Sequence, residues 1–183
     1  MPKFIAFLRA INVGGHNVKM ELLRAEFESM GFTNVETFIA SGNVIFHSRS
    51  KDEAALTRKI EKQLRESLGY DVDTFLRSEA ELSEIAKYIP FPQIEIDSNW
   101  ALNVAFVTEA LGDEADAALS KYRCELDDFH IHGRQIYWLS KSKQSESAFF
   151  KVGFERALKL RTTVRGVKTI TKLVAKHTQG IAV

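Results

Sequence analysis

Apolar residues in the first part of the chain change from a continuous run to a helical period. Residues 4–11 are all apolar except for Arg9, and the polar Asn12 comes next. The apolar run is therefore too short for a helix before Gly14 and Gly15. We therefore predict a buried strand here. Helical spacing comes next at Met20, Leu23, Phe27 and Met30, and again at Leu56, Ile60, Leu64 and Leu68. The pattern predicts two amphipathic helices.

Cap residues indicate where these helices begin and end. Ser50 and Glu53 have the spacing of a capping box, so the second helix should begin after Ser50. Gly31 should end the first helix and Gly69 the second, because glycine adopts the left-handed conformation that closes a helix.

Two short β-type segments separate the helices. Residues 35–40 and 44–47 flank the turn Ser41-Gly42-Asn43, which is typical of a β-hairpin, and residues 72–76 form a further strand. The order strand, helix, strand, strand, helix, strand suits a four-stranded antiparallel sheet with both helices on one face. We therefore predict an α+β fold with the ferredoxin-like arrangement.

After a helix predicted from Ser78 to Pro90, the same order of elements starts again. We predict strands at 101–107, 129–131, 135–139 and 162–165, and helices at 113–122, at 147–158 and from Val167 onwards. The repeat distance is roughly 90 residues, which places Gly133 over Gly42. We expect one ferredoxin-like unit at 1–77, a helical linker at 78–98, and a second unit with a C-terminal amphipathic helix at 99–183.

The predicted topology brings separate segments to one edge of the first sheet. In this arrangement the first strand lies between the third and the fourth, and the third strand runs antiparallel to it. The loop 12–19 and the turn 41–43 should therefore lie side by side. The connection 69–71 should reach the same edge.

This edge carries the residue types that an anion site requires. Glycines before a helix let the backbone approach a ligand, and the helix N-terminus offers unpaired N–H groups. The candidate ligand-binding residues are Arg9, Asn12, Gly14, Gly15, Asn17, Lys19, Ser41, Gly42 and Asn43. The alternative is that the glycines only make turns and that the polar side chains satisfy the backbone, since neither G-x-G-x-x-G nor G-x-x-x-x-G-K-[ST] is present.

Three segments also form a recognisable set. They are Leu8-Arg9-Ala10-Ile11-Asn12-Val13-Gly14-Gly15-His16-Asn17, the hairpin Ser41-Gly42-Asn43-Val44-Ile45-Phe46, and the tail Thr163-Val164-Arg165 with Thr169 and Lys172-Leu173. Together they resemble the bacterial family known as domain of unknown function 1697, in the same order and over almost the whole chain. The resemblance implies a two-part α+β fold and brings no established activity with it.

The chain departs from that family at two places. Ala10 stands where the family usually has glycine, and Gly166-Val167 follows Arg165 where the family typically has Asn-Trp. A contact made by that tryptophan is therefore missing here. Arg165 and Lys172 still match, and the resemblance makes these two residues candidate ligand contacts.

Composition indicates a packed, cytoplasmic protein. Of the 183 residues, 45% are hydrophobic and 27% are charged, which excludes overall disorder. Cys124 is the only cysteine, so the fold cannot depend on an internal disulfide. The N-terminus lacks the apolar stretch of a secretory signal, and no apolar run approaches a membrane span, so we expect no membrane partner.

Charge is distributed unevenly along the chain although the formal net charge is only +1. Residues 109–128 hold seven acids against Lys121 and Arg123, and residues 151–176 hold eight bases against Glu155. Such asymmetry indicates an anionic partner or two segments that face each other. Lys168, Lys172 and Lys176 fall on one face of the last helix, so nucleic-acid binding through this tail is an alternative function.

Other patterns are weaker. His130 and His132 share one face of a strand, but no third ligand is evident, so solvent-facing histidines are the better interpretation. We expect no metal and no cofactor. An assembly module that pairs through its sheets is a further alternative, and the oligomeric state stays open. The preferred hypothesis is a small anionic ligand at the edge from Arg9 to Lys19, with the reaction, if there is one, unassigned.

Overall fold

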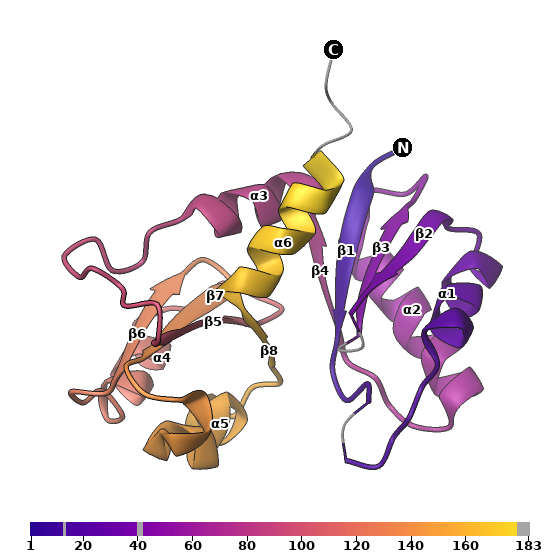
Figure 1. Cartoon of the computed structure of the whole chain (residues 1–183). Coiled ribbons are helices and arrows are strands. Elements are labelled where there is room, and N and C mark those ends of the chain that lie inside the picture. The colour runs from indigo at the N-terminus through magenta and orange to yellow at the C-terminus, as the bar shows by residue number, and fades with distance from the viewer. Residues whose placement is uncertain (13, 40–41, 179–183) are drawn as a thin grey trace. The chain divides into compact units, whose positions relative to one another are not determined.

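The computed structural model describes residues 1–12, 14–39 and 42–178. The chain divides into two compact units, Met1–Ile85 and Ala86–Val183. Each unit has one four-stranded antiparallel sheet with helices packed against it (Figure 1). The fold is therefore α+β, as the apolar pattern predicted.

The first unit has the predicted order of elements. They are β1 (Lys3–Leu8), α1 (Met20–Ser29), β2 (Thr33–Phe38), β3 (Asn43–His47), α2 (Glu53–Leu68) and β4 (Thr74–Ser78). The strand order is β2-β3-β1-β4, so β1 lies between β3 and β4 as the ferredoxin-like arrangement requires. Helices α1 and α2 cover the same face of this sheet (Figure 1).

Alternate residues of β1 explain why the helices cover that face. Phe4, Ala6 and Leu8 point into one core cluster together with Leu23 and Phe27 of α1 and the buried stripe of α2. Aromatic rings fill the centre, with the rings of Phe32 and Phe46 4.4 Å apart. Burial of each large apolar side chain contributes about 1.5–3 kcal/mol, which fixes the face that the strand presents to the helices.

The ends of α2 confirm one cap prediction and correct another. Gly69 ends the helix with φ 80°, as expected. The N-cap is Asp52 and not Ser50: the Asp52 side chain accepts a hydrogen bond from the Ala55 backbone N at 2.9 Å. Ser50 instead accepts from the Asp52 backbone N at 3.1 Å. A serine and an aspartate can both cap a helix, and here the one nearer the first turn does so.

Helix α3 (Glu79–Lys87) directly follows β4. Ser78 and Glu81 form the predicted capping box: Glu81 N donates to Ser78 Oγ at 3.2 Å, and Ser78 N donates to Glu81 Oε2 at 2.9 Å. The helix ends before Pro90, three residues earlier than predicted. Across the described ranges, no helix is both long enough and apolar enough to cross a bilayer.

The second unit repeats the topology of the first. Its elements are β5 (Ala101–Phe106), α4 (Asp113–Ser120), β6 (Asp127–His132), β7 (Gln135–Ser140), a 3-10 turn (Gln144–Glu146), α5 (Ala148–Leu158), β8 (Thr163–Gly166) and α6 (Val167–Thr178). The strand order β6-β7-β5-β8 is that of the first sheet. The chain thus contains two ferredoxin-like arrangements and an additional C-terminal helix.

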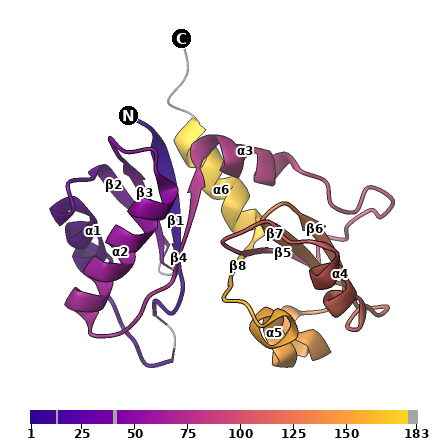
Figure 2. The same cartoon turned by 180° about the vertical axis from the view of Figure 1, so that it is seen from behind.

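Helices cover both faces of the second sheet. On one face, Ala105 and Trp138 pack with Leu119 of α4 and with Phe149 and Phe154 of α5. Helix α6 lies on the opposite face (Figure 2), where its Ile170 and Leu173 are fully buried. The apolar stripe predicted for the last helix is therefore its contact with the sheet.

The hairpin turns occupy equivalent places in the two units. In the first unit, Leu8 N donates to Gly42 O at 2.8 Å. In the second, Val107 N donates to Arg134 O at 3.2 Å and Leu111 N donates to Gly133 O at 3.0 Å. Each turn thus contacts the end of the unit's first strand or the segment that follows it.

Gly42 is held tightly at this edge. Its φ is 76°, in the left-handed region, and a Cβ atom there would lie 2.9 Å from Ile11 Cβ and 3.2 Å from Leu8 Cβ. Gly31 has a similar φ of 83°, but a Cβ there would meet nothing within 4 Å. A substitution at Gly31 therefore meets only the cost of the left-handed backbone, whereas the same substitution at Gly42 meets that cost and a steric clash as well.

Gly42→Ala should therefore lower the free energy of unfolding by more than Gly31→Ala does. The backbone cost of about 1–2 kcal/mol applies to both variants, and overpacking adds about 1–3 kcal/mol for Gly42→Ala alone. Urea unfolding of both variants and wild type measures the difference. Equal losses in the two variants would show that the turn does not press on Ile11.

Candidate functional site

The loop that follows β1 has a left-handed backbone at four of its described positions. The φ values are 63° at Ala10, 54° at Asn12, 62° at Gly14 and 90° at Gly15. Residue 13 lies outside the described residues. The replacement of the family's glycine by Ala10 therefore has a cost, because the left-handed conformation of an L-residue is unfavourable by about 1–2 kcal/mol.

The loop folds back on itself through Asn12. Its Oδ1 accepts a hydrogen bond from the Val18 backbone N at 2.6 Å. Gly14, Gly15 and Asn17 are exposed, and a Cβ at either glycine would meet nothing within 4 Å. The backbone at Gly14 and Gly15 is therefore accessible to a ligand, whereas the side-chain Oδ1 of Asn12 is used in a hydrogen bond within the loop.

Helix α1 begins directly after this loop. Lys19 is its N-cap, with extended φ and ψ, and no side chain caps the helix there. Lys19 is exposed and adds positive charge, while Glu21 places one carboxylate in the first turn. The start of α1 thus has N–H groups without a side-chain cap, and its charge is partly offset by Glu21.

Arg9 fastens the loop to the connection before β4. Its backbone N donates to Asp73 O at 2.9 Å, and its Nη1 lies 3.4 Å from Asp73 Oδ2. The Arg9 side chain is 39% exposed and that of Asp73 is 15% exposed. The connection from α2 therefore reaches the loop's edge as predicted, and the Arg9 side chain is partly exposed there.

His16 and Tyr70 are two residues of this edge that the sequence did not single out. Their rings stack with centroids 3.9 Å apart. Burial raises the pKa of Tyr70, and its hydroxyl oxygen is buried with no hydrogen-bond partner among the described residues. The signal available was indirect: Tyr70 follows Gly69, in the connection predicted to reach this edge.

The hairpin turn contributes less chemistry than predicted. Asn43 is fully buried, and its Nδ2 donates to Phe38 O at 2.9 Å across the hairpin. Gly42 packs on Ile11 and Leu8. Ser41 lies outside the described residues. The described part of the turn thus stabilises the sheet edge on which the loop rests.

Arg165 and Lys172 belong to the second unit. Arg165 is 8% exposed, and its Nη1 donates to Thr163 Oγ1 at 2.7 Å and to Val164 O at 2.9 Å. Burial lowers the pKa of Arg165 to about 10. Lys172 lies on the exposed side of α6. Of the two residues carried over from the family, one is therefore built into the sheet and one faces solvent.

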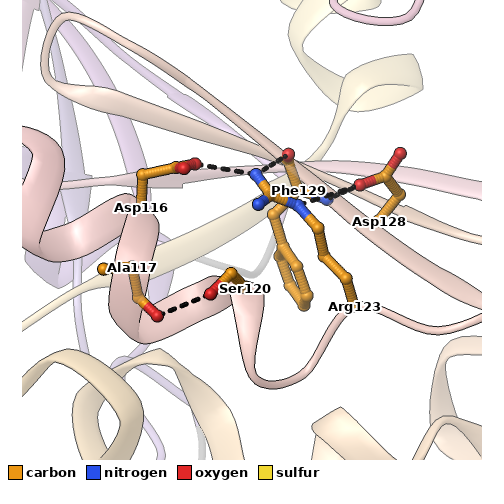
Figure 3. A network of polar contacts seen from close by, with 6 residues as sticks. All are labelled: Asp116, Ala117, Ser120, Arg123, Asp128 and Phe129. Atoms are coloured by element: carbon orange, nitrogen blue, oxygen red, sulfur yellow. Dashed lines mark hydrogen bonds and ion pairs between the residues drawn. The ribbon is translucent and has the colours of Figure 1, made fainter.

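The acidic stretch of the second unit is tied together by its own arginine (Figure 3). Arg123 Nη2 donates to Asp116 Oδ1 at 2.7 Å and to Phe129 O at 3.0 Å, and its Nε lies 3.2 Å from Asp128 Oδ1. The hydrogen bond to Asp116 is the main reason that the pKa of Arg123 is raised. This network joins α4 to β6.

The two strand histidines contact a tyrosine. Tyr88 Oη lies 2.7 Å from His130 Nε2, and the rings of Tyr88 and His132 stack with centroids 4.1 Å apart. His132 is exposed, but His130 is half-buried, so the interpretation as solvent-facing holds for His132 alone. Within the described ranges, no group of three or more His, Cys, Asp or Glu could hold a metal ion.

Residues 1–137 match the family model described as "Protein of unknown function (DUF1697)". The chain belongs to this family. The match includes the loop and the hairpin of the first unit, and in the second sheet β5, β6 and the first half of β7. The family's description assigns it no activity.

One solved structure shares the fold over nearly its whole length. It is described as "The structure of conserved bacterial protein SP0830 from Streptococcus pneumoniae". It is 26% identical, has a TM-score of 0.76, and the alignment covers 97% of this chain and 99% of that one. It agrees with the duplicated ferredoxin-like arrangement. No curated protein matches the chain.

Ala10→Gly should be neutral or should raise the free energy of unfolding by up to about 1 kcal/mol, because glycine removes the left-handed penalty that exceeds its own entropic cost. The matched control is Ala25→Gly on the exposed side of α1, where glycine should cost about 1 kcal/mol. Urea unfolding measures both variants. A loss at Ala10 as large as that at Ala25 would contradict the left-handed backbone.

His130 should make stability depend on pH. Burial lowers its pKa below the ordinary 6.5, and His132 lowers it further. At pH values between the folded-state pKa and about 6.5, the unfolded chain binds more protons at this histidine than the folded chain does. The stability that the neutral His130 contributes is therefore fully present above about pH 6.5 and is lost as the pH falls through this range. Urea unfolding at pH 7 and at pH 5 should show a smaller loss for His130→Gln than for wild type. An identical loss in both proteins would rule this out.

Proposed function

We propose that the edge formed by the loop from Arg9 to Lys19 binds a small anionic ligand. The observation that carries this proposal is the left-handed backbone at Ala10, Asn12, Gly14 and Gly15 immediately before a helix whose start has no side-chain cap. Glycine adopts this conformation without strain, so the strain lies at Ala10 and Asn12. Strained non-glycine backbone concentrates where a protein binds or reacts.

The charged residues at the edge limit the negative charge of the ligand group that it can bind. Arg9 and Lys19 attract an anion, and the N–H groups at the start of α1 can donate to it. Glu21 in the first turn opposes them. We therefore propose one phosphate or one carboxylate group as the part recognised, and not a polyanion, with the remainder of the ligand near the stacked His16 and Tyr70 rings.

The proposal concerns binding, and we assign no reaction to the site. We also propose a cytoplasmic location, because Cys124 is the only cysteine and the fold gains its stability from core burial. The nucleic-acid alternative loses one charge, because Arg165 is buried, but Lys168, Lys172 and Lys176 of α6 are exposed as that alternative requires.

Thermal unfolding with ligands tests the proposal. Inorganic phosphate, AMP and acetate are each added to wild type at increasing concentration, and at least one of them should raise Tm. At a concentration 100 times Kd, the gain in stability should be about 2.7 kcal/mol. Arg9→Ala and Lys19→Ala should each reduce this response by about tenfold in affinity, because each removes one charge-assisted contact.

Arg24→Ala is the matched control. Arg24 is an exposed arginine of α1 that pairs with Glu28 at 3.7 Å, away from the helix start, and its removal should leave the ligand response unchanged. Each variant is compared with its own ligand-free Tm, so that a loss of the Arg9–Asp73 contact is not mistaken for a loss of binding. A flat Tm for all three ligands, or an equal loss in Arg24→Ala, would count against the site.

A further inference from the structure

A cavity of about 410 Å³ lies in the second unit, between the segment that leads into β5 and the start of α6. Its lining comes from residues 96–98, 100–103 and 166–168 and is mostly apolar. The largest lining side chain is Trp100, which is half-buried and has Lys141 Nζ 5.3 Å from its ring centroid. A cavity of this size can hold a small organic molecule.

Asn103 gives the cavity a buried polar group. The residue is 5% exposed, and its Nδ2 has no hydrogen-bond partner in the part of the chain that the structure describes. A buried amide left in this state costs about 1–3 kcal/mol. Gly166 lies opposite Asn103 on β8, and a Cβ there would lie 3.8 Å from Asn103 Oδ1. The Asn103 amide oxygen thus lies beside Gly166, and both residues line the cavity.

The N-terminus of α6 adds the partial positive charge of a helix dipole, with no acidic side chain in the first turn to offset it. Gly166 precedes the helix and has no side chain with which to cap it, and the first turn contains Lys168 and no acid. The first turns of α2, α3 and α4 all contain acids. A lysine at a helix N-terminus is unfavourable for the helix alone but favourable for an anion bound there.

The groups lining the cavity favour a single negative charge. Lys168 Nζ lies 3.5 Å from Ser98 O, on the same lining. Asp97 also lines the cavity, and its Oδ1 accepts from Asn99 N at 2.8 Å. The described lining thus contains one acid and one base, so a doubly charged phosphate is disfavoured relative to a carboxylate.

We propose that this cavity binds a small monocarboxylate with an apolar or aromatic body. The carboxylate accepts from Lys168, from the N–H groups at the start of α6, and from the Asn103 amide after rotation about χ2, a broad torsion in asparagine. The apolar body lies against Trp100. All of these residues belong to the second unit, so the proposal is independent of the loop site around Arg9.

Titration of the full chain with phenylacetate tests this site. The readouts are tryptophan fluorescence and the NMR signals of the Asn103 side-chain amide. The chain has two tryptophans, and Trp138 lies in the core at 3% exposure, so a fluorescence change reports on Trp100. Saturable binding of phenylacetate should be about tenfold tighter than that of uncharged 2-phenylethanol or of acetate, which lacks the apolar body.

Two lysines on α6 supply a matched pair of variants. Lys168→Ala should weaken phenylacetate binding by about fivefold or more, whereas Lys172→Ala removes the same charge one turn further on, beyond the cavity lining, and should change it by less than about twofold. Asn103→Ala should abolish the saturable response. If that variant fails to fold, Ala101→Phe, which fills the cavity from the start of β5, replaces it.

Three results would overturn the proposal. The first is the absence of saturable binding of phenylacetate to wild type, which is the outcome for a cavity that holds only water. The second is equal weakening in Lys168→Ala and Lys172→Ala, which indicates attraction to the charge of α6 in general. The third is equal affinity for phenylacetate and 2-phenylethanol, which shows that the carboxylate is not recognised.

Discussion

The pairing of the first strand of each sheet with two later strands is the constraint on which the rest of the structure depends. In the first unit, Phe7 of β1 lies opposite Asn43 of β3 and Leu8 lies opposite Thr74 of β4. A slip of one residue would turn Phe4, Ala6 and Leu8 out of the core, so burial fixes the register. The loop after β1 must therefore start between the hairpin turn and the connection from α2.

This constraint explains how much of the fold could be predicted from the sequence. The periods of apolar residues determine the elements, and the glycines at 42 and 69 mark turns whose φ values of 76° and 80° other residues rarely adopt. Both are local signals. The N-cap of α2 was not decided locally, because Ser50 and Asp52 can each cap a helix, and only the structure shows which one accepts from the first turn.

The candidate site could be predicted as a place but not as a set of side-chain roles. The amides of Asn12 and Asn43 hydrogen-bond to backbone groups of the loop and of the hairpin. The stack of His16 on Tyr70 joins residues far apart in sequence. Arg165 was carried over from the family tail and is buried in the sheet. Apolar periodicity determines which elements pack together, whereas the partner of a polar atom depends on tertiary contacts that no local pattern records.

The two proposed sites show how one topology can present different chemistry. Helix α1 follows a strained loop and has Glu21 in its first turn, whereas α6 follows β8 directly and has Lys168 in that position. The attraction of a helix start for an anion falls off within about one turn, so the residues of that turn decide its strength. The Nδ2 of Asn103, which has no hydrogen-bond partner among the described residues, lies on the cavity at the start of α6 and not at the start of α1. Units that share a strand order therefore need not share a ligand.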